Sequence, residues 1–111
     1  MKEHRELEFK ESITNTFLKT VSAFANYGNG KIIFGISDDG RYVGIENTKQ
    51  ACLDIENKIN DALKPLPKYT IDIDDNTKLI TLTVEKGKDT PYLYKGKAYI
   101  RNDSSTIEVG Q

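Results

Sequence analysis

Apolar and polar side chains follow regular patterns along this chain, and these patterns predict its first two elements. Leu7 and Phe9 alternate with charged residues, which is the period-two signal of a half-buried strand over residues 6–10. From residue 12 to residue 26, apolar side chains recur at helical spacing, as on the buried stripe of an amphipathic helix. A glycine at position 28 favours a helix end there, because glycine accepts the left-handed conformation that often stops a helix.

The segment after this helix is almost wholly apolar and rich in β-branched residues. Residues 31–36 therefore predict a central strand that is covered on both faces. Residues 37–40 form a turn signal, and residues 41–45 are predicted to be the return strand of a hairpin. Gly35 and Gly44 lie inside these strands, which suggests a bulge or a close approach of two backbones.

A second helix and several shorter strands complete the predicted order. Residues 48–63 carry another apolar stripe at helical spacing, and two prolines end that helix. Residues 102–109 place cap-forming side chains before an apolar position, which predicts the start of a further helix. Alternating apolar residues predict strands over residues 69–74, 79–84, 92–94 and 98–101.

This order of elements predicts an α/β fold of the α+β kind, with a mixed β-sheet and two main helices. A chain of 111 residues with 37% hydrophobic residues suits a single domain over residues 1–111. No apolar run approaches the ~18 residues of a membrane span, so no membrane partner is expected. Because the final pattern is that of an element only just begun, we expect the chain to be the N-terminal part of a longer protein.

The counts of cysteine and histidine limit the redox and metal chemistry. Cys52 is the only cysteine and His4 the only histidine, so no internal disulfide can form. This predicts a cytoplasmic location, where thiols stay reduced. A structural zinc ion needs four such ligands, so none is expected within one chain. No cofactor is certain on these grounds, and Mg²⁺ or Mn²⁺ remains the open alternative.

Carboxylates from two parts of the chain could form a site for such a hard cation. Glu3 and Glu8 lie near the start of the chain, and Asp38 and Asp39 follow the predicted central strand. If the first strand neighbours the central one, two or three of these side chains could meet at one end of a sheet. Mg²⁺ and Mn²⁺ prefer oxygen ligands, and a bound ion could activate water for phosphodiester cleavage. Glu3 and Glu8, however, face opposite sides of an uninterrupted strand, so they converge only if the chain bends. The alternative is that Glu8 lies on a solvated strand face and Asp38 belongs to a turn.

Positive charge gathers in the last third of the chain. Residues 86–101 hold five cations and one acid, although the whole chain has a net charge of −1. Three tyrosines are interleaved with them, and cations for phosphates with rings for bases are typical of a nucleic-acid surface. The alternative is an exposed hairpin kept soluble by lysine, with half-buried tyrosines. The candidate contacts are Lys86, Lys88, Tyr94, Lys95, Lys97 and Arg101, with Arg5 and Lys10 nearer the N-terminus.

Four stretches of the chain are shared in order and spacing with a known family. They are LEFK at 7–10, VSAFAN at 21–26, GKIIFGISDDG at 30–40 and VGI at 43–45. Through them the chain resembles the Alba-like domain of Schlafen proteins, which in bacteria and archaea is widespread in predicted transcriptional regulators. Arg101 and the Ser-Ser-Thr run at 104–106 fit the family's C-terminal pattern, with Asp103 in place of a glycine.

The resemblance implies nucleic-acid binding and, for the animal proteins, a nuclease. In animal Schlafens two such lobes form a cradle that cuts transfer and ribosomal RNA with two glutamates and an aspartate. The matching positions are Glu3, Glu8 and Asp38, so the resemblance implies that these would be the catalytic and metal-binding residues if this domain is a nuclease. The animal domain also has a zinc site of histidine and cysteine, which this chain lacks.

These observations leave three functions open. The first is a nucleic-acid-binding domain, for DNA or RNA, in a transcriptional regulator that continues beyond residue 111. The second is a metal-dependent endoribonuclease acting on structured RNA. The third is an oligomerisation domain, and because the family's cradle needs two lobes we expect a homodimer. We favour the first function, with dimerisation as its physical means.

Overall fold

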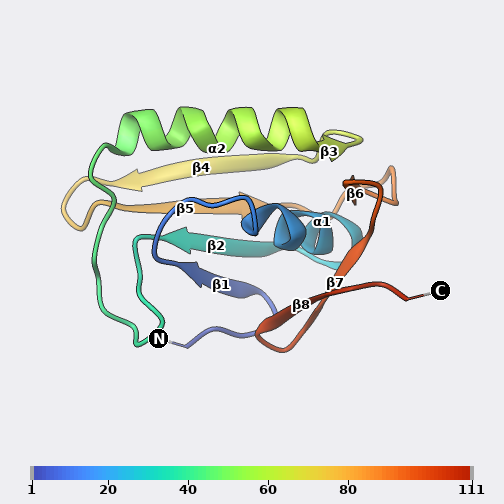
Figure 1. Cartoon of the computed structure of the whole chain (residues 1–111), viewed down its shortest axis with the longest axis horizontal. Helices are drawn as coiled ribbons and strands as arrows, with labels where there is room; N and C mark the ends of the chain where they lie inside the picture. The colour runs from blue at the N-terminus through green and yellow to red at the C-terminus, as the bar shows by residue number, and fades with distance from the viewer. Residues whose placement is uncertain (1, 111) are drawn as a thin grey trace.

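The computed structural model describes residues 2–110, and its centre is a mixed four-stranded sheet (Figure 1). β1 and β2 run parallel with Leu7 opposite Lys31, while β5 is antiparallel to both β2 and β4. The predicted mixed sheet and α+β class are confirmed. In the sheet order β1-β2-β5-β4, the strands are Leu7–Lys10, Gly30–Phe34, Leu79–Val84 and Tyr69–Asp74.

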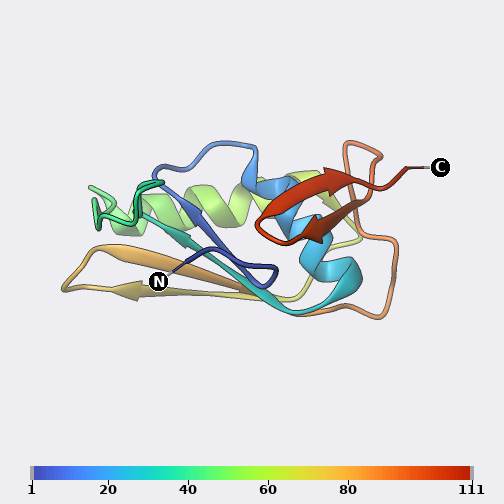
Figure 2. The same ribbon diagram turned by 90° about the horizontal axis from the view of Figure 1, so that it is seen from below.

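Two helices cover one face of this sheet, as the turned view shows (Figure 2). α1 (Phe17–Tyr27) connects the parallel strands β1 and β2, which require a crossover because a tight turn cannot join parallel strands. α2 (Thr48–Ala62) lies along β4 and β5. Neither helix is long and apolar enough to cross a membrane, within the part of the chain described here. The core between helices and sheet includes Phe17, Phe24, Phe34, Ile55, Ile59, Ile80 and Leu82.

The rest of the chain forms two small antiparallel pairs. β3 (Leu63–Lys64) pairs with β6 (Leu93–Tyr94), and β7 (Tyr99–Asn102) pairs with β8 (Ser105–Glu108). The helix predicted at 102–109 is therefore wrong, because this segment is the turn and second strand of a hairpin. Asp103 takes a φ of 54° in that turn, a conformation that aspartate tolerates better than most residues.

Two other predicted boundaries change. α1 begins at Phe17 and not at residue 12, because the polar segment before it crosses from the end of β1 to the helix. The helix ends next to Gly28, as expected, but that glycine has an extended φ of 166° and not the left-handed conformation. The backbone N–H of Gly28 still donates to the carbonyl oxygen of Phe24, at 3.1 Å.

The strand predicted to be covered on both faces is β2, and the helices cover only one of its faces, while Ile33 on the other face packs against a small second cluster. Ile32 and Phe34 are buried under the helices, whereas Lys31 on the opposite face is exposed. The predicted return strand at 41–45 reduces to an isolated bridge between Ile36 and Tyr42. The expected close approach of backbones is confirmed, since a Cβ on Gly35 would lie 3.1 Å from the Cα of Gly44.

Candidate functional site

Glu8 points into the domain and not into solvent. It pairs with Ile32 across β1 and β2, and both side chains face the helices. Glu8 is only 7% exposed, while Leu7 and Phe9 pack on the opposite face of the sheet in a small second cluster. The expectation that Glu8 lies on a solvated strand face is therefore wrong, and the reason is that both helices cover the face on which it lies.

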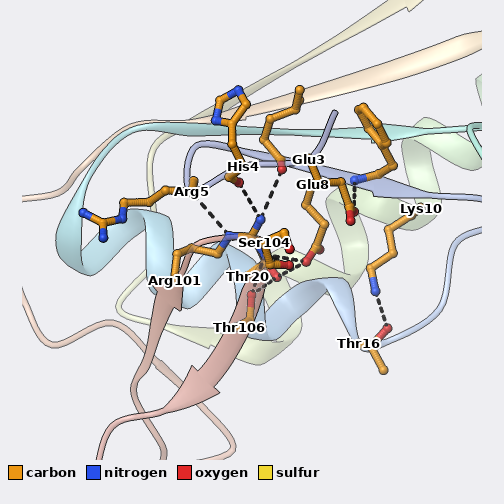
Figure 3. A network of polar contacts seen from close by, with 12 residues as sticks. Glu3, His4, Arg5, Glu8, Lys10, Thr16, Thr20, Arg101, Ser104 and Thr106 are labelled. Carbon is orange, nitrogen blue, oxygen red and sulfur yellow. Dashed lines mark hydrogen bonds and ion pairs between the residues drawn. The ribbon is translucent and has the colours of Figure 1, made fainter. Parts of the chain in front are cut away.

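Arg101 on β7 is the partner of Glu8. Its Nη1 lies 2.9 Å from Oε1 of Glu8, and both side chains are shielded from solvent. Two threonines complete the contact. The hydroxyl of Thr20 on α1 donates to the same Oε1 at 2.9 Å, and Nη1 of Arg101 also donates to Oγ1 of Thr106 on β8, at 3.0 Å. One carboxylate thus joins β1 to α1 and to the β7–β8 hairpin (Figure 3).

The remaining donors of Arg101 hold the N-terminal segment. Nη2 donates to the carbonyl oxygens of His4, at 2.8 Å, and of Leu7, at 3.1 Å, and Nε donates to that of Arg5, at 3.1 Å. A guanidinium has five N–H groups, and this geometry occupies them. Arg101 is therefore a structural residue, and it is not free for the phosphate contact predicted from the sequence. We call Glu8, Thr20, Arg101 and Thr106 the Arg101 network.

The Glu8 carboxyl has an unusual environment within this network. Burial raises the pKa of Glu8 above its ordinary value, and Lys10, Thr20 and Arg101 act against that effect by favouring the ionised form. Its second oxygen, Oε2, is buried with no hydrogen-bond partner among residues 2–110. The ion pair with Arg101 nevertheless requires the ionised form of Glu8, because a guanidinium pairs with a negatively charged carboxylate.

The structure does not bring the three predicted metal ligands together. Glu3 folds back over β1, so that its Oε1 accepts the backbone N–H of Phe9 at 2.7 Å, and its charge contributes to raising the pKa of Glu8. Asp38 lies beyond the end of β2 in an exposed turn. Residues 2–110 contain no group of three or more histidine, cysteine, aspartate or glutamate side chains that could hold a metal ion.

Glu8 also does not suit a Mg²⁺ or Mn²⁺ ion on chemical grounds. Glu8 already binds the Arg101 guanidinium, so a cation there would meet a buried positive charge. Asp39 is the neighbour of Asp38 in the turn. It accepts a hydrogen bond from Ser37 and forms an ion pair with Arg41 at 3.1 Å. The Ser37 hydroxyl, with further contacts from Arg41, holds the pKa of Asp39 below its ordinary value. The Glu8 carboxylate is therefore engaged by Arg101 and not available as a metal ligand.

The three tyrosines of residues 86–101 are packed inside and do not offer their rings to a ligand. Tyr92, Tyr94 and Tyr99 are 4%, 5% and 7% exposed. Asn26 on α1 accepts the backbone N–H of Tyr92, at 2.6 Å, and donates to its carbonyl oxygen, at 2.9 Å. The nearby Ser22 hydroxyl donates to that carbonyl at 2.7 Å. The interpretation of these rings as a base-stacking surface is therefore wrong, because the rings are buried in the core and the backbone of Tyr92 is fixed to α1.

The predicted lysine contacts fall into two groups. Lys10 donates to Thr16, and Lys97 pairs with Glu108 at 3.4 Å. The Lys95 ammonium lies over the ring of Tyr94, 5.5 Å from its centroid. The side chains of Lys86 and Lys88, by contrast, are exposed and form no ion pair with any residue in the range 2–110.

The loop that carries these two free lysines is anchored at the C-terminal end of α1. The backbone N–H of Gly87 donates to the carbonyl oxygen of Ala25, at 2.8 Å, and that of Lys86 donates to Oδ1 of Asn29, at 2.6 Å. A side chain on Gly87 would collide with the Tyr92 hydroxyl, so the loop needs glycine to approach this closely. The lysines thus project from a backbone with a defined position.

A solvent-open cavity of about 570 Å³ lies beside this loop. It lies between the end of α1, the N-terminal segment and β7. Its exposed polar rim includes Arg5 and Glu6, and Figure 3 shows the Arg5 side chain directed away from the Arg101 network. The cavity is lined by Arg5, Glu6, Ala23, Phe24, Tyr27, Gly28, Asn29, Ile100 and Arg101.

Sequence reasoning missed several residues of this site. Thr20, Thr106 and Tyr27 were assigned no role, although Tyr27 is the only exposed residue of α1, at 51%. The sequence did carry a signal for Tyr27, because this aromatic residue at the end of α1 lies off the apolar stripe that forms the buried face of the helix. Thr106 lies in the Ser-Ser-Thr run that fits the family pattern, but no signal marked Thr20, because its role depends on contacts with segments far away in the chain.

Comparisons with known proteins agree with this fold. The solved structure of the N-terminal domain of a RecG-related protein from Nitrosomonas europaea is 24% identical, with a TM-score of 0.68, covering 95% of this chain and 83% of that one. A protein from Corynebacterium diphtheriae is 17% identical, with a TM-score of 0.65, and the chain covers only 22% of its length.

A search among curated proteins finds no match. The family comparison, in contrast, covers nearly the whole chain. The family described as Schlafen, AlbA_2 matches residues 3–110, which include both the Arg101 network and the cavity. The chain therefore belongs to the Schlafen AlbA_2 family, as its sequence motifs indicated.

Proposed function

We propose that this domain binds nucleic acid through the cations around the C-terminal end of α1. The observation that carries the proposal is that Lys86 and Lys88 are exposed, without an ion-pair partner in residues 2–110, on an anchored loop. Arg5 lies on the rim of the same cavity. Membership of the Schlafen AlbA_2 family supports a nucleic-acid partner.

Binding by this surface is local and electrostatic. The chain as a whole has a net charge of −1, so it cannot attract a polyanion from all sides. Exposed lysine and arginine side chains that contact phosphates release counterions, and the affinity then falls as the salt concentration rises. The role in a transcriptional regulator, which the family resemblance implies, would be exerted through such binding.

Fluorescence anisotropy with labelled single-stranded and duplex oligonucleotides, over a series of salt concentrations, tests the proposal. Lys86→Ala and Lys88→Ala should each weaken binding to all sequences and reduce the steepness of the salt dependence by about one ion. Lys49→Ala is the matched control, because that exposed lysine lies at the start of α2, at the opposite end of the domain (Figure 1). Undetectable binding at low salt, or equal losses in all three variants, would overturn the proposal.

A further inference from the structure

The exposed ring of Tyr27 is out of place in its own helix. Every other residue of α1 is buried or half-buried, whereas Tyr27 is 51% exposed. Its position beside the cavity gives the ring a surface to share with a bound molecule. A flat aromatic ring at the mouth of a cavity is suited to stack on another flat ring.

The cavity has the size and the polarity of a site for one nucleotide. Its volume of about 570 Å³ lies within the usual range of small-molecule pockets. Phe24 and Ile100 form an apolar part of the lining, and Arg5 supplies positive charge at the rim. Across the cavity, Asn29 is tied to the backbone of Lys86, so the free lysines of the anchored loop begin at its edge.

We propose that this cavity receives one unpaired nucleobase of a single strand, with Tyr27 stacked on the base and Arg5 beside a flanking phosphate. The inference rests on the proposed function and assigns its substrate class. A base in a duplex is stacked and paired, so it cannot enter without being flipped out. The preferred substrate is therefore single-stranded RNA or DNA.

The polar lining also predicts which bases fit. The Glu6 carboxylate only accepts hydrogen bonds, and Asn29 uses its Oδ1 for the Lys86 backbone, which leaves its Nδ2 to donate. A carboxylate in this position favours the bases with an exocyclic amine, which are cytosine, adenine and guanine. Uracil and thymine lack that amine, so they should bind less tightly.

The test uses the full chain, with Tyr27→Ala, Tyr27→Phe and the control Tyr42→Ala, whose ring is 59% exposed outside the cavity lining. Anisotropy titrations employ single-stranded oligo(A), oligo(C) and oligo(U) as RNA, single-stranded oligo(dA) and oligo(dT), and a mixed duplex. Tyr27→Ala should weaken single-strand binding by roughly 5- to 150-fold, since base stacking on an aromatic ring accounts for that range. Tyr27→Phe should retain the affinity, and oligo(U) should bind more weakly than oligo(A) and oligo(C).

The outcomes separate this inference from the proposed function. If Lys86→Ala weakens binding while Tyr27→Ala does not, the nucleic-acid surface stands and the base pocket is overturned. An equal loss on duplex and single strands in Tyr27→Ala would also overturn the pocket, because a duplex cannot use it. A loss confined to single strands supports it, and a matching change in RNA and DNA shows that the base and not the sugar is recognised.

Discussion

Arg101 and Arg5 meet at the same cavity, yet they have opposite roles. Arg101 is 5% exposed and its donors are occupied by Glu8, by two residues of the β7–β8 hairpin and by backbone carbonyls, including the one of Arg5. Arg5 contributes that carbonyl to the network and keeps its guanidinium at the exposed rim. The comparison shows what separates a structural arginine from one that is available to a ligand. The deciding property is whether its N–H groups are already hydrogen-bonded within the protein, and not the residue type.

The same contrast divides the tyrosines. Tyr92, Tyr94 and Tyr99 lie among the lysines in the sequence but are buried, whereas Tyr27 lies in a helical stripe and is exposed. The backbones of Tyr92 and Tyr99 are fixed to α1 by Ser22 and Asn26, whereas the Tyr27 ring lies exposed at the end of that helix.

The largest effect should come from breaking the Arg101 network. Arg101→Leu leaves the Glu8 carboxylate buried without its partner, which costs about 3–5 kcal/mol in buried ion pairs. Urea denaturation, followed by circular dichroism, measures the change in the free energy of unfolding. Arg5→Ala is the matched control, and it should stay within about 0.5 kcal/mol of the unmodified chain, as exposed substitutions do.

A double variant sharpens this comparison. Glu8→Met combined with Arg101→Leu removes both charges, so it should lose less stability than Arg101→Leu alone, because no unpaired charge remains. If the loss in free energy of unfolding of the double variant equals the summed losses of Glu8→Met and Arg101→Leu, the charge interaction does not couple these residues. That result would leave only the loss of packing as the cause.

A smaller effect is expected from the clamp between α1 and Tyr92. Asn26→Ala leaves the backbone N–H of Tyr92 without a partner, although Ser22 still donates to the Tyr92 carbonyl, and an unsatisfied buried group costs about 1–3 kcal/mol. Ser22→Ala should cost less, because Asn26 still donates to the Tyr92 carbonyl and the bond that Ser22 accepts from the Tyr99 backbone N–H is longer, at 3.3 Å. Thermal unfolding ranks the variants, and equal losses for both would contradict the assigned importance of Asn26.

The smallest effect is a pH dependence. The pKa of Glu8 is raised in the folded chain by burial, so the folded state holds that proton more tightly than the unfolded one. The resulting contribution to stability is present at pH values below the ordinary carboxyl pKa of about 4.5, and it is lost as the pH rises through the folded pKa. Glu8→Gln removes this slope.

Denaturation of both chains at several pH values measures the difference in their free energies of unfolding. The stability of the unmodified chain relative to Glu8→Gln should fall as the pH increases through that window. A rise in relative stability would show that Arg101 outweighs burial and lowers the pKa of Glu8. Either sign identifies which of the two effects controls the charge inside the Arg101 network.

Much of the fold followed from local pattern, because periodicity depends only on neighbours in the chain. The strands β1, β4 and β5 and the two helices were predicted from spacing. The hairpin of β7 and β8 was not, since its turn at Asp103 also resembles a helix cap. The sequence also did not predict which face of the sheet the helices cover. Glu8 is buried because they cover the face on which it lies.

The sequence alone determined the family, the α+β class and the set of charged residues, because motifs and composition are written in residue order. Only the tertiary structure decided which charges are free. The N–H groups of Arg101 are occupied by acceptors more than 90 positions away in the chain, such as the His4 carbonyl and the Glu8 carboxylate. Tyr27 and Asn29 line the same cavity, and Asn29 holds the backbone of Lys86 at its edge. Long-range contacts of this kind arise from packing, so local patterns of residues carry no record of them.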